Sequence, residues 1–106
     1  MKVTITEQGN KVLVAISGEL ETAVCEELSQ ELAPLSGRGA LQIEMDLSKL
    51  TFISSSALRV FLSIAKEQEA AGGSVKVTAI TPMAYSVFDL TGFSRIFLDP
   101  DTKVVA

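Results

Sequence analysis

Three consecutive serines, Ser54, Ser55 and Ser56, are the residues whose type and position best suit regulatory chemistry. They follow Phe52 and Ile53 and stand where an apolar-rich helical pattern begins. A helix N-terminus presents unpaired N–H groups and a positive dipole end, so it can accommodate an added phosphate. A phosphoserine adds about −1.5 to −2 charges at pH 7, enough to repel an acidic or apolar docking partner. The cluster therefore predicts a position at which one phosphate could switch binding.

The same serines also have a purely structural interpretation. Ser54 or Ser55 could simply cap the helix, because a serine hydroxyl accepts hydrogen bonds from the first N–H groups of a helix. Capping serines are far commoner than regulatory ones, so these residues taken alone favour capping.

The sequence lacks the residues on which most enzyme mechanisms depend. Histidine is absent, which removes Ser-His-Asp and Cys-His nucleophiles and the commonest metal ligand. The single cysteine, Cys25, can form no intramolecular disulfide and is expected to pack against apolar neighbours in a reducing compartment. The carboxylates of Glu44, Asp46 and Asp89 show no spacing that indicates a shared cleft. Segment 36–40 lacks the spacing and lysine of a phosphate-binding loop, so we expect neither an enzyme nor a cofactor or metal.

Composition restricts the partners and the compartment. The chain has 106 residues, of which 47% are apolar, which suits one domain over residues 1–106. Its net charge is −4 and its nine basic residues are scattered, so direct nucleic-acid binding is not expected. There is no signal-peptide pattern and no run approaching the roughly 20 apolar residues of a membrane span. These features predict a soluble cytoplasmic protein without membrane insertion.

The elements that must position the serines begin with two β-branched segments, 3–7 and 11–17, which predict a hairpin. A helix is expected next, with Thr22 as its N-cap. Its inner positions are apolar and its outer ones acidic or polar: Cys25, Leu28, Leu32 and Leu35 inside, Glu26, Glu27, Gln30 and Glu31 outside. Alternation over 41–47 predicts an inner strand over those residues.

The helix after the serines should span about residues 55–71 and be largely buried, with glycines 72 and 73 stopping it. A strand is expected over 75–80, then a helix from Thr81-Pro82 to Gly92. Residues 93–98 are expected to form a short strand or turn, followed by a tail of uncertain order. All five phenylalanines are expected in the core: Phe52, Phe61, Phe88, Phe93 and Phe97. This order predicts an α/β fold with a mixed sheet, opened by a hairpin, parallel in its later strands and covered by helices.

Three blocks of the sequence resemble a known family. Residues 46–58 are similar to the STAS signature, an Asp-Leu-Ser run followed by Phe-hydrophobic-Asp-Ser-Ser-Gly-Leu. Residues 18–23 resemble its Gly-Glu-Leu-Asp loop, and residues 87–97 resemble its C-terminal segment. The chain thus resembles a STAS-domain anti-sigma factor antagonist over nearly its whole length. Two positions depart from the signature, since Ser54 replaces aspartate and Ala57 replaces glycine.

The resemblance implies a regulator that binds an anti-sigma factor with serine-kinase activity and thereby frees a sigma factor. The kinase would phosphorylate the regulator, and a serine phosphatase would reverse the modification. The family's acceptor falls on Ser55, and the departures leave Ser54 and Ser56 as further candidates. The expected partner-binding residues are Glu19, Glu21, Thr22, Ser54, Ser55, Ser56 and Arg59.

Two alternatives remain open. Glu21 and Thr22 could simply start a helix without contacting a partner. The protein could also be an unphosphorylated STAS scaffold subunit, in a stress-signalling assembly or beside a lipid-transport ATPase. The absence of aspartate before Ser55 favours this scaffold hypothesis.

Overall fold

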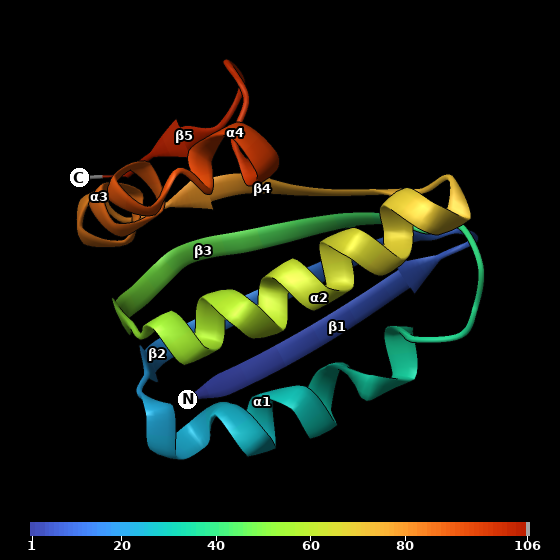
Figure 1. Cartoon of the computed structure of the whole chain (residues 1–106), viewed down its shortest axis with the longest axis horizontal. Helices are drawn as coiled ribbons and strands as arrows, with labels where there is room; N and C mark the ends of the chain where they lie inside the picture. The colour runs from blue at the N-terminus through green and yellow to red at the C-terminus, as the bar shows by residue number, and fades with distance from the viewer. Residues whose placement is uncertain (106) are drawn as a thin grey trace.

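The computed structural model describes residues 1–105, and its centre is one five-stranded sheet in the order β1-β2-β3-β4-β5. Its strands are β1 (Lys2–Gln8), β2 (Lys11–Leu20), β3 (Gln42–Ile53), β4 (Ser74–Ile80) and β5 (Lys103–Val104). β1 pairs antiparallel with β2, and all later pairs are parallel (Figure 1). The predicted mixed sheet with an opening hairpin is confirmed.

The helical segments connect these strands. They are η1 (Thr22–Val24), α1 (Cys25–Leu32), η2 (Ala33–Leu35), α2 (Ser55–Ala71), α3 (Pro82–Thr91) and α4 (Ser94–Phe97). On β2, Val12, Val14 and Ile16 are buried, whereas Leu13 between them is 44% exposed. This alternation means that the helices cover one face of the sheet and leave the other face open.

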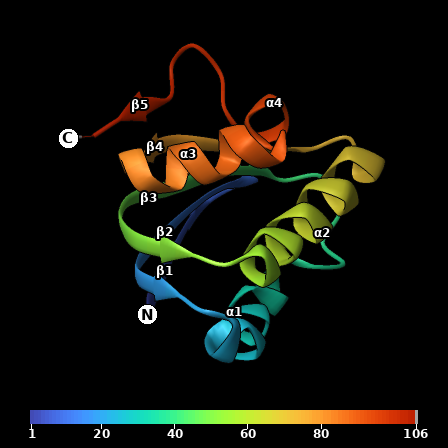
Figure 2. The same ribbon diagram turned by 60° about the vertical axis from the view of Figure 1, so that its left-hand side comes forward.

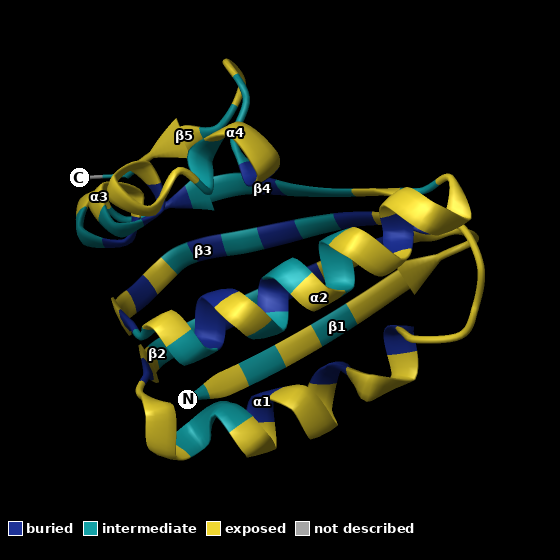
Figure 3. Ribbon diagram, in the orientation of Figure 1, coloured by how far each residue is buried: buried dark blue, intermediate teal, exposed yellow. Residues whose placement is uncertain are grey.

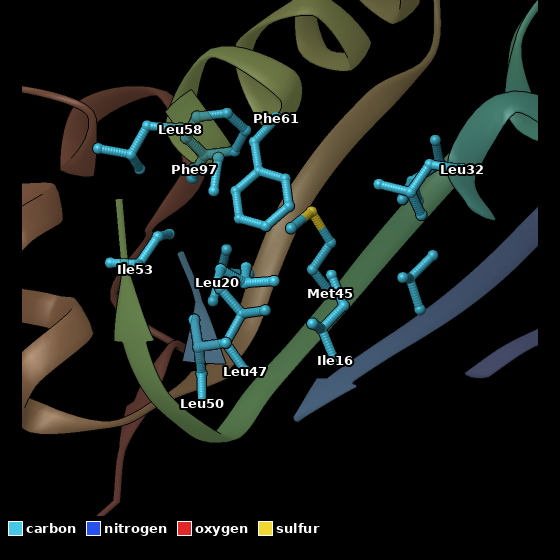
Figure 4. Packing of buried hydrophobic residues seen from close by; sticks show 14 of the residues in the cluster. Ile16, Leu20, Leu32, Met45, Leu47, Leu50, Ile53, Leu58, Phe61 and Phe97 are labelled. Carbon is cyan, nitrogen blue, oxygen red and sulfur yellow. The ribbon is translucent and has the colours of Figure 1, made fainter. Parts of the chain in front are cut away.

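The hydrophobic core lies between that covered face and the helices (Figure 4). Met45 and Leu47 of β3 face Phe61 of α2, and burial of such a side chain contributes about 1.5–3 kcal/mol. Phe88 of α3 and Phe97 of α4 pack edge to face, with ring centroids 5.7 Å apart. These contacts hold α2, α3 and α4 on the same sheet face.

Helix α2 has the predicted bounds but not the predicted burial. Gly72 ends it with a left-handed φ of 87°, which a residue without a Cβ adopts most easily. Its buried positions are few: Ala57, Leu58, Phe61 and Gln68. The rest is half-buried or exposed (Figure 3), because α2 rests on the sheet along one side and meets solvent along the other.

Two further expectations about local structure were wrong. β3 does not end at residue 47 but continues to Ile53, because its pairing with β2 continues there. Residues 94–97 form α4 instead of the short strand or turn expected over 93–98, since the tail residues 103–104 occupy the sheet edge beside β4. The hydroxyl of Thr102 donates to the carbonyl of Val77 at 2.7 Å and anchors that tail.

The C-terminal half of α2 is tied to the chain before β3 by one buried amide. Gln68 is 1% exposed, its Oε1 accepts from Leu41 N at 2.7 Å, and its Nε2 donates to Gly39 O at 3.2 Å. A Cβ at position 73 would overlap both Gln68 Oε1 and the Leu41 carbonyl oxygen, so Gly73 is required for this close approach.

We expect Gln68→Leu to lower the free energy of unfolding by about 1–3 kcal/mol, because the buried N–H of Leu41 loses its acceptor. Urea denaturation followed by circular dichroism measures this loss. Gln30→Leu, at an exposed position of α1, is the matched control and should change stability little. Equal midpoints for the two variants would contradict the role of the buried amide.

Candidate functional site

The C-terminal ends of β2 and β3 lie side by side and bring the predicted site together (Figure 2). Glu19 pairs with Phe52 and Leu20 pairs with Ile53. The N–H of Ser54 then donates to the carbonyl of Leu20 at 2.9 Å. Because the two strands are parallel, the loop after β2 and the start of α2 leave the sheet at the same edge.

Phe52 is on the surface, so the prediction that it lies in the core was wrong. The β2–β3 register shifts between Ala15 and Ser17 and again between Gly18 and Glu19. Such bulges re-aim side chains. As a result the buried residues Leu50 and Ile53 are three positions apart instead of two, and Phe52 between them is 45% exposed. Simple alternation along a strand could not reveal this ring as part of the site.

The three serines differ in what their hydroxyls do. Ser54 is half-buried and is the N-cap of α2, with its Oγ accepting from Ala57 N at 3.2 Å. Ser55 is exposed, is the first residue of α2, and makes no side-chain hydrogen bond with another residue in the range 1–105. Ser56 is half-buried. Capping therefore explains Ser54 and leaves the hydroxyl of Ser55 accessible.

Cys25 lies directly behind the cap. Its side chain is half-buried against the core, as expected, and its Sγ lies 3.7 Å from Ser54 Oγ. The thiol also donates to the carbonyl of Glu21 at 3.4 Å. Cys25 thus connects the loop after β2 to the start of α2.

An open depression lies beside the serines, and we call it the acidic depression. Its lining residues are Glu19, Glu21, Thr22, Thr51, Phe52 and Ser54. A hydrogen bond with the Glu19 carboxyl, and repulsion between the two charges, raise the pKa of the Glu21 carboxyl above its ordinary value. The depression thus presents concentrated negative charge beside an exposed aromatic ring.

The expected N-cap role of Thr22 was wrong. Thr22 is the first residue of the 3₁₀ turn η1, and Glu21 precedes that turn without a side-chain cap. The turn is closed by the backbone, with Val24 N donating to Glu21 O at 3.1 Å. Four of the predicted binding residues meet in the acidic depression, namely Glu19, Glu21, Thr22 and Ser54.

Arg59 stands to one side of the acidic depression. It is exposed on α2, one turn after Ser55, and lines a separate groove between α1 and α2 with Ser29, Leu32 and Val60. Its guanidinium makes no ion pair or hydrogen bond within the described part of the chain. The surface around Ser55 therefore has an acidic side and a basic side.

The carboxylates considered for catalysis do not share one site. Glu44 and Asp46 lie on the open sheet face, where Glu44 pairs with Lys11 at 3.5 Å and Asp46 accepts from Ser48 N at 2.9 Å. Asp89 is exposed on α3, across the sheet.

Within residues 1–105 no cluster of three or more potential metal ligands occurs. None of the described helices has the length and apolar character needed to cross a bilayer.

A hairpin-opened mixed sheet, with an exposed serine where β3 enters α2, defines the class as a small α/β domain of the STAS type. Residues 3–99 match the family model described as "Mlab, STAS domain". The chain is 32% identical over 97 residues to BtrV of Bordetella bronchiseptica, a protein assigned to the anti-sigma factor antagonists, covering 92% of this chain and 84% of that one. It therefore belongs to the STAS-domain anti-sigma factor antagonist family.

Two further comparisons agree. The anti-sigma-B factor antagonist of Bacillus subtilis is 28% identical over 96 residues, which covers 91% of this chain and 87% of that protein. The unphosphorylated anti-sigma factor antagonist SpoIIAA superposes with a TM-score of 0.74 at 20% identity, over 92% of this chain and 87% of that one. This second similarity shows that the fold is shared.

We expect Glu21→Gln to raise the melting temperature by about 1–2 °C at pH 7, because it removes the repulsion from Glu19. The folded-state pKa of Glu21 lies above the ordinary 4.5, so the repulsion is present above that pKa and disappears as the pH falls through it. The gain should vanish near pH ~4. Thermal melts at both pH values measure it.

A double-mutant cycle supplies the control. In a Glu19→Gln background, Glu21→Gln should add no stability at pH 7, because the repulsion is already gone. An equal gain in both backgrounds would show that the two carboxylates do not interact.

Proposed function

We propose that this protein acts in the cytoplasm as an anti-sigma factor antagonist: it binds an anti-sigma factor that is a serine kinase and so frees a sigma factor. The observation that carries the proposal is the hydroxyl of Ser55, which is exposed beside the acidic depression and has no hydrogen-bond partner among residues 1–105. The docking surface comprises Glu19, Glu21, Thr22, Phe52, Ser54, Ser55, Ser56 and Arg59. The names of the two similar proteins from Bordetella and Bacillus support the same partner class.

Phosphorylation of Ser55 by the bound kinase would end the interaction. Of the three serines, Ser55 is the exposed one, whereas the Ser54 hydroxyl is engaged in the cap and Ser56 is half-buried. A phosphate adds about −1.5 to −2 charges beside the carboxylates of Glu19 and Glu21. A partner surface that packs closely against the uncharged Ser55 hydroxyl would then be displaced by the bulk and the desolvation cost of the phosphate, until a serine phosphatase removes it. SpoIIAA, which shares the fold, has been solved in a phosphorylated form as well.

The two departures from the family signature are compatible with this function. Ser54 accepts the N–H of Ala57, so a hydroxyl performs the capping that an aspartate also could. Ala57 is fully buried inside α2, and no residue other than glycine has a positive φ in the range 1–105. Alanine at this helical position therefore costs no backbone strain and favours the helix.

A second candidate is the unphosphorylated STAS scaffold subunit, of a stress-signalling assembly or of a lipid-transport ATPase. The observation that favours it is the missing carboxylate at position 54, because a kinase could read that charge. The scaffold would use the same docking surface without phosphate turnover. Affinity purification from the native cells that recovers a transporter subunit, with Ser55 unmodified, would select this candidate.

We expect the cognate kinase to add one phosphate to the protein, at Ser55. Peptide mass spectrometry after incubation with ATP, with and without phosphatase treatment, locates the phosphate. Ser55→Ala should remain unmodified, and Ser56→Ala is the matched control that should still be phosphorylated. Modification of Ser54 or Ser56, or none at all, would contradict the assignment of Ser55.

The same variants test the switch itself. Ser55→Ala should keep the affinity for the anti-sigma factor, whereas Ser55→Asp should weaken it by about tenfold or more, equivalent to about 1.4 kcal/mol. Isothermal titration calorimetry compares the two. Equal affinities would contradict a mechanism based on charge.

Phe52 should contribute to binding and little to stability. Because its ring is 45% exposed, Phe52→Ala should change the free energy of unfolding by less than about 1 kcal/mol. Loss of an aromatic side chain from the centre of an interface should lower affinity at least about fivefold. Leu90→Ala removes another exposed apolar side chain, on α3 outside the docking surface, and should leave binding unchanged. If Phe52→Ala binds the anti-sigma factor as tightly as the unaltered protein, Phe52 is not part of the docking surface.

A further inference from the structure

Arg59 is positioned to reach Ser55. The two residues are four apart on α2, which places them on the same helix face with Cβ atoms about 5–6 Å apart. Long helical side chains lean toward the N-terminus over the i−3 and i−4 positions, which here are Ser56 and Ser55. Both Ser55 and Arg59 are exposed, and no ion pair with another described residue holds the guanidinium away from Ser55.

Arg59 is also uncommitted. Among the other basic residues, Arg38 pairs with Glu7, Lys76 pairs with Asp99 at 2.8 Å, and Lys11 lies near Glu44. Arg59 makes no such pair with any described residue. The segment from Gly18 to the end of α1 supplies no competing cation, because every charged side chain in it is acidic: Glu19, Glu21, Glu26, Glu27 and Glu31.

We propose that Arg59 is an intramolecular receptor for a phosphate on Ser55, an inference that rests on the proposed function. The guanidinium fork binds two phosphate oxygens at once, which suits it better than a lysine ammonium. The helix start supplies only part of this binding, since the N–H of Ala57 is already bonded to Ser54 and the N–H groups of Ser55 and Ser56 remain.

This contact would give the modification a second effect. Phosphorylation would add negative charge next to the acidic depression and would also withdraw the basic group that flanks it. An anti-sigma factor that pairs an acidic side chain with Arg59 would lose that contact as well. The docking surface would then be negative throughout, whereas before modification it had a negative side and a positive side.

The test uses phosphoserine inserted at position 55 during translation, so that it needs no kinase. We expect ³¹P NMR titration to give a second phosphate pKa that is lower by about 0.3–1 unit with Arg59 than in Arg59→Gln. Arg59→Lys should give an intermediate value. Arg95→Gln, at an exposed position of α4, is the matched control and should titrate like the unaltered phosphoprotein.

A second readout observes the guanidinium directly. In ¹H–¹⁵N spectra of the arginine Nε–H groups, the Arg59 signal should shift on phosphorylation while those of Arg38 and Arg95 stay in place. The contact is overturned if the phosphate pKa is the same in Arg59→Gln, or if Arg95→Gln changes it equally. A kinase that fails to modify Ser55 would instead overturn the proposed function and leave the measured contact standing.

Discussion

The parallel pairing of β2 and β3 at their C-terminal ends is the constraint on which the docking surface depends. It places Glu19 beside Phe52 and carries the chain, through the bond from Ser54 N to Leu20 O, straight into α2. Neither segment could present these groups alone, because the acidic residues and the serines are some thirty positions apart in sequence. The buried side chains of Leu20 and Ile53 anchor this junction from inside (Figure 4).

Irregularity in that pairing is as important as the pairing itself. Two register shifts in β3 keep Leu50 and Ile53 in the core while releasing Phe52 to solvent. A regular strand would have to bury or expose these residues in strict alternation. Because of the bulges, the short segment 50–53 contributes side chains to both the core and the surface.

At the start of α2, the neighbouring serines make different contacts, and the proposed function gives them different roles. The Ser54 hydroxyl is engaged with Ala57 N and lies against the thiol of Cys25, so the helix start is ordered without help from Ser55. Modification of Ser55 would therefore change the charge of the surface without removing the cap. The pKa of the Glu21 carboxyl is raised by its hydrogen bond with Glu19 and by repulsion between the two charges, which reflects the concentration of negative charge there.

Much of the architecture was determined by sequence alone. The hairpin, the bounds of α2, the strand over β4 and the helix from Pro82 to Gly92 follow from local apolar periods, caps and glycine stops, which act over a few residues. The motif at residues 46–58 likewise indicated the family, and it pointed to Ser55 as the expected phosphorylation site. These features need no knowledge of distant contacts.

Only the tertiary structure decided the rest, because it depends on what a distant strand or helix contributes. The length of β3, the exposure of Phe52 and the partial exposure of α2 follow from pairing with β2 and from coverage of a single sheet face. Residues 94–97 became a helix because the tail took the sheet edge beside β4. The distinction among Ser54, Ser55 and Ser56 required the hydrogen bonds and burial of each hydroxyl, which identical side chains in sequence cannot reveal.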